Sequence, residues 1–228
     1  MRKQPMQARA QQTVGTILTA VTQILEREGA LRLTTNHIAE RAGFSVGTVY
    51  QYFPDKRAIL SALADRGQKI AQDEMRAEVR AAAPCGLETV ARIIVRGTVQ
   101  CNCVYRDKVK AMLLSRFDRR EFEHVKERHD VFGDFVRDVL VEFAPGEIRD
   151  LGPTGGYVLV SAMLGAIQCA FLADSPLPRS TEFEDELVRM FVTYVRREPT
   201  QEARASAASA GRRTSAGSPR TRGTAPTP

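Results

Sequence analysis

Residues 35–54, with the sequence TNHIAERAGFSVGTVYQYFP, constrain the fold more than any other part of the chain. Their apolar periodicity predicts two short helices, over 36–42 and 45–53, joined by a tight turn. Gly43 gives the turn a permissive backbone, and Ser45 is a favourable cap for the second helix. This is the pattern of a helix-turn-helix, whose second helix is free to enter a groove of DNA. A plain helical hairpin is the alternative.

Helical periodicity continues on both sides of this segment. Residues 14–25 carry an apolar stripe at helical spacing, and Gly29 is suited to the end of that helix. Pro54 precedes a long helix, and further periodic stretches cover 87–104, 107–116, 119–142, 155–173 and 181–197. Strand-like alternation is nowhere persuasive. The sequence therefore predicts an all-α fold, with an N-terminal three-helix head and a C-terminal helical domain.

Composition and charge narrow the class of protein. The chain is 43% apolar, which excludes a wholly disordered protein, and four cysteines are too few for a secreted disulfide scaffold. Residues 1–70 hold ten Lys and Arg against five Asp and Glu, whereas 71–197 hold 18 against 20. A basic head on a near-neutral body favours binding to a polyanion, although ordinary scatter of surface charge is an alternative.

The composition also sets the expected boundaries. Residues 1–8 are predicted to be a flexible basic N-terminus, 9–70 the DNA-binding domain, and 71–197 the effector-binding and dimerisation domain. Residues 198–228 are rich in Arg, Ser and Pro, and after Glu198 no Leu, Ile, Val or aromatic residue follows. Because such a segment cannot bury enough apolar surface, it is predicted to be a disordered tail.

An uncharged stretch at 151–173 raises the question of a membrane span. It opens with Gly and Pro, and Ser161 and Gln168 interrupt it, so a helix buried between other helices is the better interpretation. The glycine-rich run at 152–156 is expected to be a loop. No apolar signal segment is visible at the N-terminus, and the chain is predicted to be cytoplasmic.

The segment 9–63 resembles the DNA-binding domain of the TetR family of bacterial one-component transcriptional regulators. The resemblance covers about a quarter of the chain. It is carried by Ile17-Leu18, Glu28-Gly29, Leu33-Thr34-Thr35, Ile38-Ala39, Ala42-Gly43, Ser45, Gly47-Thr48-Val49-Tyr50, Tyr52-Phe53-Pro54, Lys56 and Ile59-Leu60. Val46 departs from the polar residue that is common in the family, which puts a base contact there in doubt or replaces it with an apolar contact to a thymine methyl.

The resemblance and the motif together nominate a set of DNA-binding residues. They share the helix starts and the face of the second helix: Thr35, Asn36, Ser45, Val46, Gly47, Thr48, Tyr50, Gln51, Tyr52 and Lys56. Thr35 is expected at a phosphate, the first turn of the second helix at base edges, and the Gln51 amide at adenine. The alternatives are that Tyr52 is partly core and that Lys56 is merely solvated.

The family implies a homodimer on a palindromic operator of double-stranded DNA. The stretches 155–173 and 181–197 are apolar enough to form the dimer interface, with a central core helix of a monomer as the alternative. A small-molecule effector is expected in the C-terminal domain, at Cys101, Tyr105, Met112, Phe117 and Gln168. These residue types favour a hydrophobic effector, and ordinary core packing is the alternative.

Neither a cofactor nor a metal is expected. Cys101 and Cys103, with His124 and His129, fit no recognised zinc spacing, so a metal or thiol sensor is the minor alternative. No catalytic motif such as a P-loop or HExxH is present, which argues against an enzyme. The resulting prediction is a repressor that a small hydrophobic effector releases from its operator. The alternative is an effector-independent or activating DNA-binding regulator.

Overall fold

The computed structural model describes residues 3–29, 32–104 and 119–197. Its helices are α1 (Lys3–Arg27), α2 (Thr35–Ala42), α3 (Val46–Tyr52), α4 (Lys56–Ala82), α5 (Leu87–Val104), α7 (Arg119–Phe143), α8 (Gly152–Leu172) and α9 (Thr181–Val195), with a 3-10 turn, η2 (Leu177–Arg179). Within these residues there is no strand, and one isolated bridge pairs Ile148 with Arg196. The prediction of an all-α fold is confirmed.

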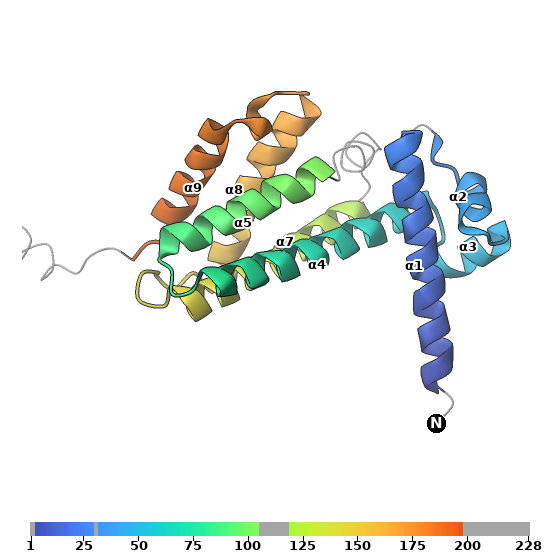
Figure 1. The fold of residues 1–228 in the computed structure, drawn as a ribbon, viewed down its shortest axis with the longest axis horizontal. Coiled ribbons are helices and arrows are strands. Elements are labelled where there is room, and N and C mark those ends of the chain that lie inside the picture. Colours follow the sequence, from blue (N-terminus) through green and yellow to red (C-terminus); the bar gives the residue numbers. More distant parts are fainter. Residues whose placement is uncertain (1–2, 30–31, 105–118, 198–228) are drawn as a thin grey trace, which may run out of the picture.

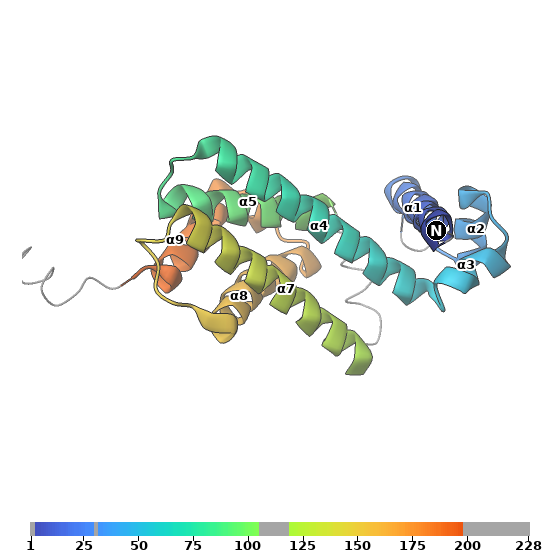
Figure 2. The same ribbon diagram turned by 90° about the horizontal axis from the view of Figure 1, so that it is seen from below.

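The helices are arranged as a small head and a larger body. Figure 1 shows α1, α2 and α3 together at one end of the molecule, while α5, α7, α8 and α9 form the body. The long helix α4 leaves the head directly after α3 and runs along the body (Figure 2). Asp55 caps α4, its carboxylate Oδ1 accepting from the Ala58 amide at 2.8 Å. One continuous helix therefore links the two parts.

Head and body have separate hydrophobic cores. The head core contains residues such as Ile17, Ile38 and Val49, and α4 contributes its first turns up to Leu63. The body core draws on α4 again from Met75 onward, together with α5, α7, α8 and α9. The expected boundary at residue 70 lies inside α4, between these two sets of contacts. At the other end of the head, α1 begins at Lys3, within the segment expected to be a flexible N-terminus.

The expectation that 152–156 forms a loop is wrong, because α8 begins at Gly152. Pro153 lies in the first turn, where the absent N–H has no intrahelical partner to lose. Gly156 crosses Gly133 of α7 at backbone contact: a Cβ placed on Gly156 would lie 3.1 Å from the Gly133 carbonyl oxygen. The glycines therefore allow close packing of α7 on α8 rather than a flexible connection.

The helix α8 is also the one, in the described part of the chain, that is long and apolar enough to cross a membrane by length and composition. Its inner face, including Leu159, Met163 and Ile167, lies in the body core. The core helix of a soluble protein satisfies the same criterion, and the packing of α8 against other helices agrees with that interpretation.

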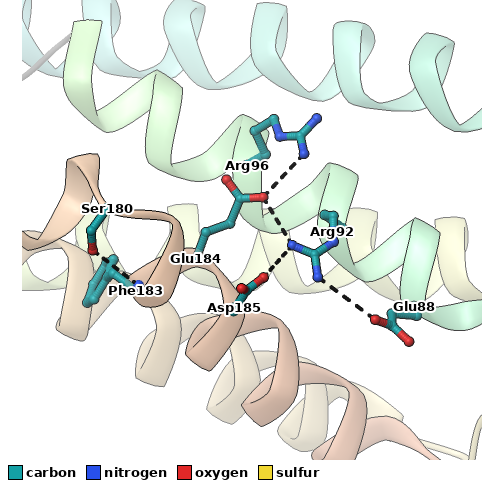
Figure 3. A network of polar contacts seen from close by, with 7 residues as sticks. All are labelled: Glu88, Arg92, Arg96, Ser180, Phe183, Glu184 and Asp185. Carbon is teal, nitrogen blue, oxygen red and sulfur yellow. Dashed lines mark hydrogen bonds and ion pairs between the residues drawn. The ribbon is translucent and has the colours of Figure 1, made fainter.

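Ion pairs join α5 to α9 on the outside of the body (Figure 3). The Arg92 guanidinium donates to Asp185 Oδ1 at 2.6 Å and lies 3.5 Å from Glu184 Oε1. Arg96 also reaches Glu184 Oε1, at 3.3 Å, and Glu88 lies 3.8 Å from Arg92. The hydrogen bond to Asp185 is the main cause that raises the pKa of Arg92, against a smaller effect of burial.

Removing this contact is expected to have a small effect on stability. Because the pair is partly exposed, a double-mutant cycle with Arg92→Ala and Asp185→Ala should give a coupling free energy of about 0.5–1 kcal/mol. Denaturant unfolding of the four proteins measures it, and the coupling should shrink in high salt. Strictly additive effects at low salt would show that Arg92 and Asp185 do not interact in solution.

A half-buried histidine links α7 to α8. His129 Nδ1 lies 2.9 Å from Ser161 Oγ, and the His129 and Tyr157 ring centroids are 6.1 Å apart. Burial lowers the pKa of His129 from its ordinary value of 6.5, as does the charge of Arg128, while Asp130 acts in the opposite direction. The folded state therefore favours the neutral imidazole.

This shift predicts a loss of stability in mild acid. Above the unfolded-state pKa of 6.5 His129 is neutral in both states, and its contribution is constant. As the pH falls below that value, the unfolded chain binds the proton first, so the unfolding free energy drops until the pH passes the folded-state pKa. Urea unfolding at a series of pH values should show this drop in the wild type and a smaller one in His129→Asn. Parallel profiles for the two proteins would contradict it.

Candidate nucleic-acid interface

Local sequence explains the turn between α2 and α3. Thr34 caps α2, its hydroxyl oxygen accepting from the His37 amide at 3.2 Å, so of the two expected caps it is Thr34 that does so. Gly43 ends α2 at φ 72°, the left-handed region that a glycine adopts without strain. The Phe44 amide then donates to the Ala39 carbonyl at 2.9 Å. The chain is thereby turned sharply toward α3.

The second helix is fixed by its own cap and one buried residue. Ser45 Oγ accepts from the Thr48 amide at 3.0 Å, as the sequence predicts. Val49 is fully buried and Phe53 nearly so, both within the head core. Since Val49 faces inward, the remaining residues of this short helix are turned toward solvent. The two capped helices are therefore held rigidly while one face of α3 stays free.

The structure places all ten predicted DNA-binding residues at the surface of the head. Exposed are Asn36, Ser45, Gly47, Tyr50, Gln51, Tyr52 and Lys56. Half-buried are Thr35, Val46 and Thr48. They come from the start of α2, the whole of α3 and the start of α4. Their common surface has the composition that a phosphate- and base-contacting surface requires: hydroxyls, an amide and a cation.

Several of these residues also contact one another. The Tyr50 hydroxyl lies 3.3 Å from Thr35 Oγ1, which joins the end of α3 to the start of α2. Ser45 Oγ lies 2.8 Å from Thr48 Oγ1. Val46 packs against the head core, so part of its side chain has a structural role. Tyr52, for which a core position is the alternative, is 37% exposed.

A polar cluster between α1 and α2 is not predicted by the sequence motifs. His37 Nε2 lies 3.0 Å from Glu28 Oε2, and Arg41 Nε donates to Gln23 Oε1 at 3.1 Å. Arg41 also lies 4.0 Å from Glu28. The spacing of His37 and Arg41, one turn apart on α2, is the signal that the sequence offers for it. These contacts orient α2 on α1 and so support the turn and α3.

The expected effector site can be followed only in part. Tyr105, Met112 and Phe117 lie outside the described residues, as do the expected helix 107–116 and the tail 198–228. Cys101 is half-buried on α5, its thiol 3.9 Å from the Gly67 carbonyl of α4, and Gln168 is half-buried on α8. A cavity of about 400 Å³ lies between α4 and α7, and neither Cys101 nor Gln168 lines it.

Within residues 3–29, 32–104 and 119–197, no group of three His, Cys, Asp or Glu side chains is arranged to hold a metal ion. His124 pairs with Glu127 at 3.3 Å, and His129 with Ser161. The two histidines of the minor metal hypothesis are therefore engaged elsewhere. The four cysteines have free thiols.

The geometry of the head defines the class of this protein. Two capped helices at a sharp turn, with the second exposing hydroxyls and an amide beside a basic helix start, form a helix-turn-helix DNA-binding head. Residues 17–63 match the family model of bacterial regulatory proteins, tetR family. Through this segment the chain belongs to the TetR family of transcriptional regulators, as its sequence motifs indicate.

Solved structures show the same fold along most of the chain. A TetR transcription regulator from Haloarcula marismortui has a TM-score of 0.56 at 16% identity, covering 82% of this chain and 100% of that one. A TetR/AcrR-family regulator from Thermobifida fusca has 0.54 at 20%, covering 81% and 97%. FadR from Bacillus subtilis, in complex with stearoyl-CoA, has 0.54 at 15%, covering 78% and 97%. No curated protein sequence matches the chain.

Proposed function

We propose that the protein is a repressor that binds a palindromic operator as a homodimer and leaves it when a small hydrophobic effector binds the body. The observation that carries the proposal is the free face of α3, capped by Ser45 and presenting Tyr50 and Gln51 to solvent. Residues 9–70 act as the DNA-binding domain, and 71–197 as the effector-binding and dimerisation domain. The protein acts in the cytoplasm, with no membrane partner.

Each surface residue has a role that its chemistry supports. Ser45, Val46, Gly47 and Thr48, in the first turn of α3, lie against base edges in the major groove, and the Gln51 amide pairs with adenine. Thr35 and Asn36 at the start of α2, the phenols of Tyr50 and Tyr52, and the Lys56 ammonium contact phosphates. The Tyr50–Thr35 contact supports this division, because it holds two phosphate-binding hydroxyls close together.

The exposed apolar face of α8 supports dimerisation. Val158 is 44% exposed, and Ala162, Ala166 and Cys169 follow it along the same outer face. A stripe of small apolar side chains on an otherwise buried helix is typical of a helix–helix interface. Paired with α9, the same helices of a second copy would complete a four-helix bundle and bring the two heads to successive half-sites.

The effector part of the proposal has weaker structural support. FadR from Bacillus subtilis, whose fold is similar, was solved with an acyl-CoA, which agrees with an apolar ligand in the body. Cys101 contacts α4 through Gly67, so a ligand near Cys101 would act on the helix that carries the head. A shift of α4 that changes the spacing of the two α3 helices would weaken binding to one of the half-sites.

A promoter–reporter experiment tests this proposal. The DNA flanking the protein's own gene is placed before a reporter, with the protein supplied from an inducible plasmid and its solution mass measured by sedimentation. A dimer that lowers reporter output is expected. Higher output would replace repression by activation, and a monomer would remove the palindromic mode. Repression that no apolar compound relieves would favour the effector-independent alternative.

A further inference from the structure

The helices α4 and α7 face each other across a groove on the side of the body nearest the head (Figure 2). From α4 the walls are Ser61, Asp65, Gln68, Lys69, Gln72 and Asp73. From α7 they are His124, Glu127, Arg128 and Val131. With the exception of Val131 these side chains are polar. The volume of about 400 Å³ falls within the ~300–1,000 Å³ of small-molecule sites.

Direct contacts cross the groove at two levels and leave the space between them open. Arg128 donates to Ser61 Oγ at 3.3 Å and lies 3.7 Å from Asp65 Oδ1. Farther from the head, Arg76 of α4 donates to Glu142 of α7 at 2.7 Å. These contacts set the spacing of the two helices without filling the cavity.

Between these contacts, α4 presents polar groups that the protein does not satisfy. The Gln72 amide nitrogen Nε2 is buried and has no hydrogen-bond partner in the described part of the chain. A buried donor without a partner reduces stability, so its retention calls for an acceptor that binds there. Lys69 and Asp73 lie one helical turn apart and are exposed. They form no ion pair with each other or with any other described residue.

We propose that this groove binds a small zwitterionic metabolite of the amino-acid class. Its carboxylate accepts from Gln72 Nε2 and pairs with Lys69, while its ammonium group pairs with Asp73. Around them the acidic groups Asp65 and Glu127 nearly balance the cation of Arg128, so the walls favour a ligand that carries both signs of charge over one with a large net charge. This ligand is distinct from the hydrophobic effector proposed above, because neither Cys101 nor Gln168 lines the groove.

A ligand held between α4 and α7 is well placed to act on the head. The residues Ile59, Leu60 and Leu63 of α4 belong to the head core, and the groove begins at Ser61 on the same helix. Fixing α4 against α7 therefore restricts the angle at which the head leaves the body. This regulatory consequence rests on the proposed function, whereas binding of the zwitterion does not.

Binding is measured without DNA, so that its failure is separate from any failure of the proposed function. The standard amino acids are screened against the full-length protein by saturation-transfer NMR and titrated by calorimetry. For each that binds, its methyl ester keeps only the ammonium group, and its deamino analogue keeps only the carboxylate. The variants are Gln72→Leu and Asp73→Asn, with Gln100→Leu, on the exposed side of α5, as the matched control.

We expect at least one amino acid to bind, and both groove variants and both singly charged analogues to weaken it by about tenfold or more, as the loss of a charge-assisted contact implies. Gln100→Leu should bind as the wild type does. Gln72→Leu should also raise the Tm of the ligand-free protein, because it removes an unsatisfied buried donor. The proposal is overturned if no amino acid binds, if an analogue binds equally well, or if the groove variants retain wild-type affinity.

Discussion

Replacing Gln51 with alanine is expected to weaken binding to the preferred DNA site while leaving binding to unrelated DNA almost unchanged. Gln51 is exposed on α3, one turn beyond the Ser45 cap. A bidentate amide–adenine contact discriminates by about 1–3 kcal/mol, which is roughly tenfold to a hundredfold for each half-site. In a dimer both half-sites lose the contact, so the effect on the specific complex is compounded.

Fluorescence anisotropy with the preferred site and with a scrambled duplex measures this change. Lys56→Gln is the informative comparison, because loss of a phosphate contact should weaken both complexes alike and reduce the salt dependence by about one charge per contact. Gln100→Ala, on the exposed side of α5, controls for the loss of a surface amide. Equal loss on the two duplexes for Gln51→Ala would remove this residue from base recognition.

Gly156→Val is expected to destabilise the body strongly. A Cβ on Gly156 would lie 3.1 Å from the carbonyl oxygen of Gly133 and 3.3 Å from its carbonyl carbon. Because these neighbours are backbone atoms, the whole of α7 or α8 must move to make room, and both helices are part of the body core. Overpacking of this kind costs about 3 kcal/mol.

Thermal unfolding followed by circular dichroism tests this effect. For a chain of this length a loss of about 3 kcal/mol lowers the Tm by roughly 6–12 °C. Gly15→Ala in α1 is the control, since no atom lies within 4 Å of the added Cβ, and it should stabilise the protein by about 0.5–1 kcal/mol. A Gly156→Val protein with the wild-type Tm would mean that α7 and α8 do not meet at these glycines.

The head can be predicted from the sequence because its signals are local. Ser45 and Gly43 specify a cap and a turn within a few residues of themselves, and their geometry is as expected. Packing between distant segments cannot be predicted in the same way. The residue types at Gly152 and Gly156 indicate a loop, since nothing in their own neighbourhood reveals that Gly133 lies against Gly156.

The α4–α7 groove illustrates the same difference. The polar residues Ser61, Asp65, Gln68 and Gln72 follow one face of a helix, which in isolation is the ordinary pattern of a solvated surface. Only the placement of Arg128 and Val131 opposite them turns that face into the wall of a cavity. The sequence shows the stripe of polar residues opposite the buried face of α4, but it does not show which helix lies across from that stripe.

The central claim is that the head binds DNA with sequence specificity. A mobility-shift titration of the wild-type protein on the DNA flanking its own gene, with excess unrelated duplex, tests this claim most directly. We predict a discrete complex that survives the competitor, weakens as salt is raised, and protects two half-sites related by two-fold symmetry. Complexes that the unrelated duplex displaces as readily as the flanking fragment itself would contradict sequence-specific recognition.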